Sequence, residues 1–409
     1  MKTLLRRATL LVAILCGLCG VAFAQQPITV PLALVDISGD ASSPDYKMGI
    51  WVGLGGGAPQ LYEFDTGGKG LWASYEKTED LDAGVNQWWG SFEDLGHDIS
   101  NVYSSGYTYH AKMVTSSVQI YGNVYSSSTG NSPGTLATQS SGSLDIAQID
   151  QAHKAGTPSS GEEWRAAVKA GQPALQTQFF GDFGVSLEVK TEGSKELFSI
   201  LPQLIPSGLT NGFIVSAGAR GNPTPQVQFG LADSDLASFP IQFDISAAYE
   251  GEYNGINTFA EELFRAMVKW SSADGSQITQ EVPIVLDTGA PVTSVHEYDD
   301  FLKVDPAFVQ EKADGGKEFK SGVFFEAIAG EWQFLINPTG DQANIDKIAI
   351  RSGDLGYVNT GILAFNTYDV LFDLDNKILA FRPIAVPEPS TLLLLSGSLL
   401  LGGMFLRRK

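Results

Sequence analysis

Short hydrophobic runs, separated by clusters of Gly, Asn, Asp and Ser, dominate the pattern along this chain. Such runs, bounded by turn residues, predict β-strands, for example at residues 28–34, 118–121, 212–215, 226–229, 282–286 and 369–372. Asp274-Gly275, between the apolar runs at 268–270 and 278–282, predicts a β-hairpin. Residues 260–267 fit a helix or a strand equally well. The pattern therefore predicts a mostly β protein.

One segment predicts a helix. Ser160-Gly161-Glu162-Glu163 has the sequence of a capping box, in which a Ser hydroxyl and a Glu carboxylate three residues later each bind the other's backbone N–H. Trp164 and Val168 follow one helical turn apart, and Gly171 is a stop signal. We expect a helix over residues 161–170.

The N-terminal end has the features of a secretory signal peptide. Lys2, Arg6 and Arg7 precede an apolar run at residues 8–21. Ala22-Phe23-Ala24 then places small residues where a signal peptidase cleaves. We expect the signal peptide to be residues 1–24.

The C-terminal end combines three parts in a fixed order. Val386-Pro387-Glu388-Pro389-Ser390 precedes an apolar run at 391–406, and Arg407-Arg408-Lys409 follows as a basic stop of the kind found on the cytoplasmic side of a membrane segment. This order resembles the PEP-CTERM sorting signal of Gram-negative bacteria, in which an exosortase recognises and processes the tail during export. The resemblance implies a transient membrane anchor and delivery to the cell surface or extracellular matrix. A plain single-span anchor is the alternative.

Composition excludes several function classes. Acidic residues outnumber basic ones by 46 to 26, a net charge of −20, so the chain lacks the basic surface that nucleic-acid binding needs. Cys16 and Cys19 both lie in the expected signal peptide, which leaves the mature chain without disulfides or cysteine metal sites. The four His residues show no paired metal-ligand spacing. We expect no metal and no cofactor.

The candidate chemistry lies in a triplet that occurs twice. Asp65-Thr66-Gly67 follows the β-prone run 61–64, and Asp287-Thr288-Gly289 follows the β-prone run 282–286. Two copies in matching contexts predict a duplicated lobe. Two aspartates held close together share one proton, so one carboxylate activates a water while the other protonates the substrate. Asp65 and Asp287 are therefore the candidate catalytic residues.

The chain resembles the pepsin-like aspartic proteases over residues 44–383. Residues 46–55 and the first triplet look like that family's first hairpin and active-site loop, residues 102–106 look like the start of its flap, and residues 361–381 look like the closing strands of its second lobe. The resemblance implies an all-β, bilobal fold with two duplicated β-barrel-like lobes and a cleft between them. It implies an endopeptidase that binds an extended peptide.

The resemblance also assigns roles to the residues around the dyad. Gly67 and Gly289 allow tight turns beside the carboxylates, and Thr66 and Thr288 cross-link the two loops. Substrate and flap contacts are implied for Tyr103, Ser105 and Trp72, with Tyr103 closing over the peptide and Trp72 supporting it.

The chain departs from the family directly after each triplet. The family has Ser or Thr there, whose hydroxyl binds the outer oxygen of each Asp, but this chain has Gly68 and Ala290, the latter followed by Pro291. Losing a donor to the ionised carboxylate raises its pKa, so we expect a pH optimum less acidic than that of pepsin.

A second departure concerns two segments expected to read hydrophobic-hydrophobic-Gly. Asp182-Phe183-Gly184 and Ile362-Leu363-Ala364 stand at the two expected places, and Asp182 and Ala364 break the pattern.

We therefore expect an exported aspartic endopeptidase that acts as a monomer, because one chain carries both aspartates. Its partners would be a peptide or protein substrate, the signal peptidase and the exosortase. A catalytically inactive surface or matrix-binding protein with the same fold is the alternative. The expected domains are the signal peptide (1–24), an N-terminal lobe (25–235) with a helical insertion near 160–171, a C-terminal lobe (236–385) and the sorting signal with its membrane segment (386–409).

Overall fold

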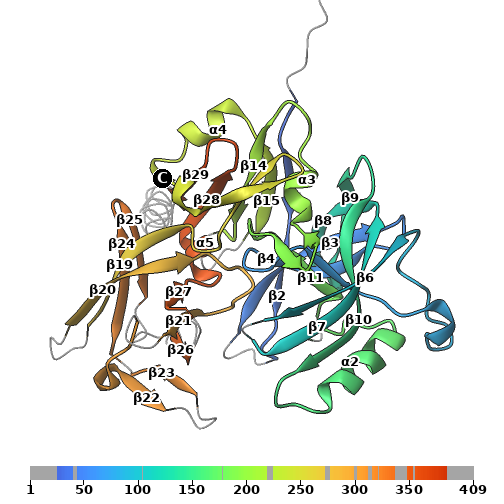
Figure 1. The fold of residues 1–409 in the computed structure, drawn as a ribbon, viewed down its shortest axis with the longest axis horizontal. Helices are drawn as coiled ribbons and strands as arrows, with labels where there is room; N and C mark the ends of the chain where they lie inside the picture. Colours follow the sequence, from blue (N-terminus) through green and yellow to red (C-terminus); the bar gives the residue numbers. More distant parts are fainter. Residues whose placement is uncertain are drawn as a thin grey trace, which may run out of the picture.

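The computed structural model describes residues 25–384 except 40–43, 104, 177, 219–223, 272–276, 299–301, 312–315, 321, 337–347 and 353–354. The expected signal peptide and sorting signal lie outside this part of the chain. No helix among the described residues is long and apolar enough to cross a membrane. Two β-rich lobes lie side by side below a shared sheet (Figure 1).

The first lobe is a ten-stranded sheet with the strand order β6-β7-β10-β5-β11-β4-β3-β8-β9, and β2 pairs with β3. The central strands are buried along most of their length, which explains their nearly continuous apolar sequences. The strands are β2 (Ala33–Asp36), β3 (Tyr46–Leu54), β4 (Gln60–Asp65), β5 (Leu71–Ser74), β6 (Glu93–Val102), β7 (Tyr107–Ser116), β8 (Val118–Ser126), β9 (Gly130–Gln139), β10 (Leu144–Lys154) and β11 (Gly181–Gly184).

The second lobe is a nine-stranded sheet with the order β22-β23-β26-β21-β27-β20-β19-β24-β25. Its strands are β19 (Phe264–Ser271), β20 (Gln277–Val285), β21 (Thr293–Glu297), β22 (Val309–Glu311), β23 (Lys317–Phe319), β24 (Phe324–Ala329), β25 (Trp332–Ile336), β26 (Ile348–Ser352) and β27 (Tyr357–Asn359). β19 and β20 pair antiparallel, as the predicted hairpin requires, and its expected turn, Asp274-Gly275, lies outside the described residues. Residues 264–267 belong to β19, which resolves the ambiguous segment as a strand at its C-terminal half.

A six-stranded sheet joins the two halves of the chain. Its order is β1-β15-β14-β28-β29-β16, and the pairing of β14 with β28 links the halves. The strands are β1 (Ile28–Pro31), β14 (Thr210–Ser216), β15 (Gln226–Leu231), β16 (Ile241–Asp244), β28 (Tyr368–Asp373) and β29 (Ile378–Pro383). The single strand predicted at 28–34 is divided at Leu32, because β1 pairs with β15 whereas β2 pairs with β3.

Short hairpins and helices complete the described structure. The hairpins are β12 (Lys190–Glu192) with β13 (Lys195–Leu197) and β17 (Tyr249–Tyr253) with β18 (Ile256–Phe259). The helices are η1 (Thr78–Asp80), α2 (Ser160–Lys169), α3 (Ile200–Gln203), α4 (Asp233–Ala237), η2 (Ser246–Ala248), η3 (Pro306–Phe308) and α5 (Leu363–Thr367). The expected lobe boundary near residue 236 falls in α4.

Helix α2 confirms the predicted helix but not its capping box. Trp164 and Val168 are buried, and α2 packs on β10. Ser160 is already inside the helix, where its hydroxyl donates to the Thr157 carbonyl (2.7 Å) and accepts from the Lys154 N–H (2.7 Å). The hydroxyl therefore fixes the preceding turn to β10 and does not cap the helix.

Candidate active site

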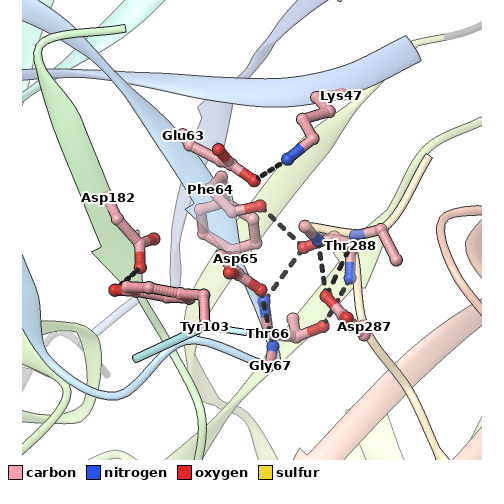
Figure 2. A network of polar contacts seen from close by, with 12 residues as sticks. Lys47, Glu63, Phe64, Asp65, Thr66, Gly67, Tyr103, Asp182, Asp287 and Thr288 are labelled. Atoms are coloured by element: carbon pink, nitrogen blue, oxygen red, sulfur yellow. Dashed lines mark hydrogen bonds and ion pairs between the residues drawn. The ribbon is translucent and has the colours of Figure 1, made fainter. Parts of the chain in front are cut away.

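Both triplets lie where a central strand of each lobe ends. Asp65 is the last residue of β4, between β11 and β3, and Asp287 follows β20, between β27 and β19. Both loops extend toward the space between the lobes, where they meet (Figure 2). Asp65 is 8% exposed and Asp287 is half-buried.

Two threonines hold the loops together across the lobe boundary. Thr66 Oγ1 donates to the Leu286 carbonyl (2.6 Å) and accepts from the Thr288 N–H (2.9 Å). Thr288 Oγ1 donates to the Phe64 carbonyl (2.6 Å) and accepts from the Thr66 N–H (3.0 Å). The four hydrogen bonds are buried and nearly symmetric, so they fix the position of one aspartate relative to the other.

The glycine of each triplet packs on the aspartate of the other lobe. A Cβ at Gly289 would lie 2.3 Å from Asp65 Cγ, and one at Gly67 would lie 2.8 Å from Asp287 Cγ. The side chains of Asp65 and Asp287 are within hydrogen-bonding reach of each other. The structure thus brings the two candidate catalytic residues together, and only glycine fits beside each of them.

The two carboxylates have different hydrogen-bond environments. Asp287 Oδ1 accepts from the N–H groups of Gly289 (2.7 Å) and Ala290 (3.1 Å), and its Oδ2 accepts from Asn359 Nδ2 (2.5 Å). Asp65 Oδ1 accepts from the Gly67 N–H (2.7 Å). Burial, followed by the nearby charge of Asp287, raises the pKa of Asp65 well above its usual range. Asp287 thus accepts three N–H hydrogen bonds and Asp65 accepts one, and burial favours the protonated form of Asp65.

The expected flap residues Tyr103 and Ser105 lie in the turn between β6 and β7. Tyr103 stands at the turn, and its hydroxyl donates to Asp182 Oδ2 (2.6 Å) (Figure 2). Ser105 is exposed two residues further on. Trp72 is fully buried on β5, and its indole N–H donates to the Lys69 carbonyl (2.8 Å). Trp72 and Tyr103 both pack against Tyr109, with ring-centroid distances of 6.1 Å from Trp72 and 4.8 Å from Tyr103.

A buried polar cluster beside Asp65 was not foreseen. Lys47 on β3 forms an ion pair with Glu63 on β4, and Asp182 on β11 lies next to Glu63 in the strand register. Each charge interrupts an otherwise apolar, central strand. A charged residue within an apolar strand was the sequence signal that could have indicated this cluster, since charged residues are rarely buried unless they are paired.

The second hydrophobic-hydrophobic-Gly segment was placed wrongly. A Cβ at Gly184 would lie 2.4 Å from the Gly68 carbonyl oxygen, and one at Gly361 would lie 2.8 Å from the Ala290 carbonyl oxygen. Gly361 also has a φ of +61°. The close backbone contact requires glycine, so the counterpart of Asp182-Phe183-Gly184 is Asn359-Thr360-Gly361 and not Ile362-Leu363-Ala364. Asn359, which sequence reasoning missed, therefore occupies the position equivalent to Asp182.

Glu261 is expected to make the free energy of unfolding depend on pH. It lines a cavity of about 20 Å³ together with Thr66 and Leu286, and burial, followed by the charge of Asp287, raises the pKa of Glu261 to about 8. A folded-state pKa above the unfolded value stabilises the fold fully below the unfolded pKa, 4.5, and this contribution is lost as the pH rises through 8. The slope for one group is at most about 1.4 kcal/mol per pH unit.

We therefore expect the melting temperature to fall between pH 5 and pH 9, and to fall less steeply in Glu261→Gln. Thermal unfolding of both proteins across this range measures the difference. Glu252→Gln, at an exposed position on β17, serves as the control and should leave the slope unchanged. Parallel curves for the native protein and Glu261→Gln would contradict this assignment.

Comparisons with known proteins concern the C-terminal tail and the fold. Residues 385–409 match the PEP-CTERM protein-sorting motif. The fold is similar to that of an aspartic proteinase from Irpex lacteus, with a TM-score of 0.52 and 16% sequence identity over 89% of this chain and 99% of the other. No curated protein matches the sequence significantly. The predicted fold class, an all-β bilobal fold of the pepsin-like type, is confirmed.

Proposed function

We propose that this protein is an exported aspartic endopeptidase with Asp65 and Asp287 as its catalytic residues. The observation that carries the proposal is the contact of the two carboxyl groups across the lobes, each beside the glycine of the opposite triplet. Buried threonine hydroxyls hold this contact in place. A pair of turn aspartates without a catalytic role would need no such cross-link.

The unequal environments of the carboxyl groups suggest their roles. Asp287, with three N–H donors, is the carboxylate that takes a proton from the attacking water. Asp65 keeps a proton at mildly acidic pH and gives it to the carbonyl oxygen of the substrate. The tetrahedral gem-diol then collapses: Asp287 gives the proton it took from water to the leaving nitrogen, the C–N bond breaks, and a gem-diol hydroxyl returns a proton to Asp65 as the carboxyl product forms. Over one cycle two protons enter the dyad and two leave it, so both carboxyl groups regain their starting states.

The substrate would be an extended peptide held under the flap. Tyr103 and Ser105 come from the β6–β7 turn, and a peptide in strand conformation can bind the backbone there. Trp72 and Tyr109 form the apolar support on which the Tyr103 ring rests.

The PEP-CTERM motif supports export followed by exosortase processing, to the surface or matrix of a Gram-negative bacterium. The expected signal peptide at residues 1–24 would start this route. The dyad is built from one chain, so the proposed enzyme works as a monomer.

Cleavage of a denatured protein substrate by the mature chain, which begins at Gln25, tests the proposal. Between pH 2.5 and pH 7 we expect activity that pepstatin inhibits and that Asp65→Asn lacks. Because the pKa of Asp65 is raised, we expect substantial activity to remain at about pH 5. Full activity near pH 2 with none near pH 5 would contradict this pH dependence.

A folded protein that cleaves nothing at any pH would favour the alternative, an inactive surface or matrix-binding protein with the same fold. Circular dichroism of the same sample establishes that it is folded, so the two results are distinguishable.

A further inference from the structure

Asp182 is a third carboxyl group beside the dyad. It lies on β11, is 2% exposed and accepts the Tyr103 hydroxyl at its Oδ2 atom (2.6 Å). Its Oδ1 atom is buried and has no hydrogen-bond partner among the described residues. A buried carboxyl oxygen without a hydrogen-bond partner lowers the stability of the fold, so its presence here calls for an explanation.

The absence of a side chain at residue 68 gives Asp182 its space. A Cβ at Gly68 would lie 2.7 Å from Asp182 Oδ2, 3.1 Å from Asp182 Oδ1 and 3.0 Å from Asp65 Oδ2. The carboxyl groups of Asp182 and Asp65 thus border the same small space. A hydroxyl-bearing side chain at residue 68 would occupy it.

The second lobe shows what a polar group at this position does. Asp182 pairs with Glu63, two residues before Asp65, and Asn359 pairs with Val285, two residues before Asp287. Asn359 donates its amide N–H to Asp287 Oδ2. Asp182 is therefore placed to serve Asp65 as Asn359 serves Asp287, provided that it carries a proton to donate.

The surroundings of Asp182 favour the protonated form. Burial, followed by the charge of Glu63, raises the pKa of Asp182 well above its usual range. The charge of Lys47, which forms an ion pair with Glu63, acts on the pKa of Asp182 in the opposite direction but more weakly than Glu63 does. Burial and the Asp182 carboxyl also raise the pKa of Tyr103, which stays a phenol and donates. The proton of Asp182 is then left for its other oxygen, Oδ1.

We propose that Asp182 is a positioning residue that stays a neutral carboxylic acid and donates its proton toward the outer oxygen of Asp65, in place of the hydroxyl missing at residue 68. The same residue accepts the Tyr103 hydroxyl, so the expected flap and the catalytic acid are connected through one side chain. This inference rests on the proposed function. As Asp65 gives its proton to the substrate, negative charge develops on Asp65, and the Asp182 hydrogen bond stabilises it.

Charged and titratable groups approach Asp182 from several elements. β5, which also pairs with β11, carries none. The groups are Glu63 and Asp65 on β4, Lys47 on β3, Tyr103 at the flap, Tyr109 on β7 and Asp287 from the other lobe.

The first test compares Asp182→Ala with Asp182→Asn in the pH profile of kcat. Asp182→Ala removes the donor, so we expect kcat to fall about 10-fold or more and the alkaline limb, where Asp65 ionises, to move up by about one pH unit. Asp182→Asn keeps an N–H donor, like that of Asn359. The alkaline limb of its pH profile should therefore move by less than half of the shift in Asp182→Ala. Asp235→Asn, in α4, removes a carboxylate that accepts from the Ala232 N–H and Gln228, and should lower stability without moving the limb.

The second test restores the missing hydroxyl. Gly68→Ser alone places its Cβ against Asp182 and should reduce activity. In Asp182→Ala the space is free, so adding Gly68→Ser should return the alkaline limb toward its original position. A lower kcat in Asp182→Ala with an unmoved limb, or no recovery in the double variant, would overturn the proposal in favour of a purely structural role.

A third measurement does not depend on turnover. A raised pKa of Asp182 stabilises the fold at low pH, and this contribution is lost as the pH rises, so the fall of Tm with pH should be shallower in Asp182→Asn. Because the proposed hydrogen bond couples Asp65 to Asp182, Asp65→Asn and Asp182→Asn should flatten the slope non-additively. Additive slopes would refute the coupling even in an active enzyme. Non-additive slopes without cleavage would support the coupling and reject the proposed activity.

Discussion

Replacing Gly289 with alanine is expected to abolish peptide hydrolysis. The added Cβ would lie 2.3 Å from Asp65 Cγ and 2.4 and 2.5 Å from its two oxygens, distances that the packed dyad cannot accept. The Asp65 carboxyl must move away from Asp287, and a displacement of about 1 Å costs about 100-fold in rate. We therefore expect kcat/KM to fall at least about 100-fold, measured by cleavage of a denatured protein substrate at the pH optimum.

Gly251→Ala is the matched control. A Cβ at Gly251, on β17, would have Thr258 Oγ1 as its nearest neighbour at 4.0 Å, which is an ordinary contact. Its activity should stay close to that of the native protein. If Gly289→Ala folds and keeps native kcat/KM while Asp65→Asn is inactive, the position assigned to the Gly289 backbone is wrong.

Thr288→Val is expected to give the largest loss of stability. Thr288 is fully buried, and valine has nearly the same shape but no hydroxyl. The Phe64 carbonyl and the Thr66 N–H would each lose a buried partner. An unsatisfied buried group costs about 1–3 kcal/mol, so we expect the free energy of unfolding to fall by about 2–5 kcal/mol. Urea unfolding with an unchanged m-value measures this loss.

Thr288→Ser separates the hydroxyl from the methyl group. It keeps both hydrogen bonds and should lose only about 1 kcal/mol, through the buried methyl. Equal losses for Val and Ser would show that packing, rather than the hydroxyl, holds the loops. Because Thr66 and Thr288 belong to one hydrogen-bonded cross-link, the stability losses of the two valine variants should not add up in the double variant.

Local sequence patterns predicted many elements of this fold. The β-prone runs at 118–121 and 226–229 lie within β8 and β15. The spacing of Trp164 and Val168 predicted α2, because one turn of a helix brings both onto the sheet. The division of residues 28–34 between two sheets was not predictable, since it depends on which distant strands, β15 and β3, accept each half.

The active-site neighbourhood was only partly predictable. The repeated triplet identified the aspartates because its meaning is local, a carboxylate followed by a tight turn. Strand pairing brings Asn359 to Asp287, 72 residues away in the chain. It also brings Lys47 on β3 to Glu63 on the neighbouring strand β4. The second hydrophobic-hydrophobic-Gly segment was misplaced for a similar reason. Ile362-Leu363-Ala364 fits the expected composition, but the close backbone contact of Gly361 with Ala290, which the sequence does not show, identifies the true counterpart.

By itself the sequence determined the β-rich, duplicated character of the chain, its C-terminal sorting motif and the two aspartates that the fold pairs, because these follow from periodicity, composition and short motifs. Only the tertiary structure decided which groups surround each carboxylate. Asp182 looked like a defect in an apolar segment, but the register of β11 with β4 and the empty space at Gly68 place it beside Asp65. Hydrogen bonding and pKa depend on neighbours in space, and neighbours in space are set by strand pairing between segments far apart in the chain.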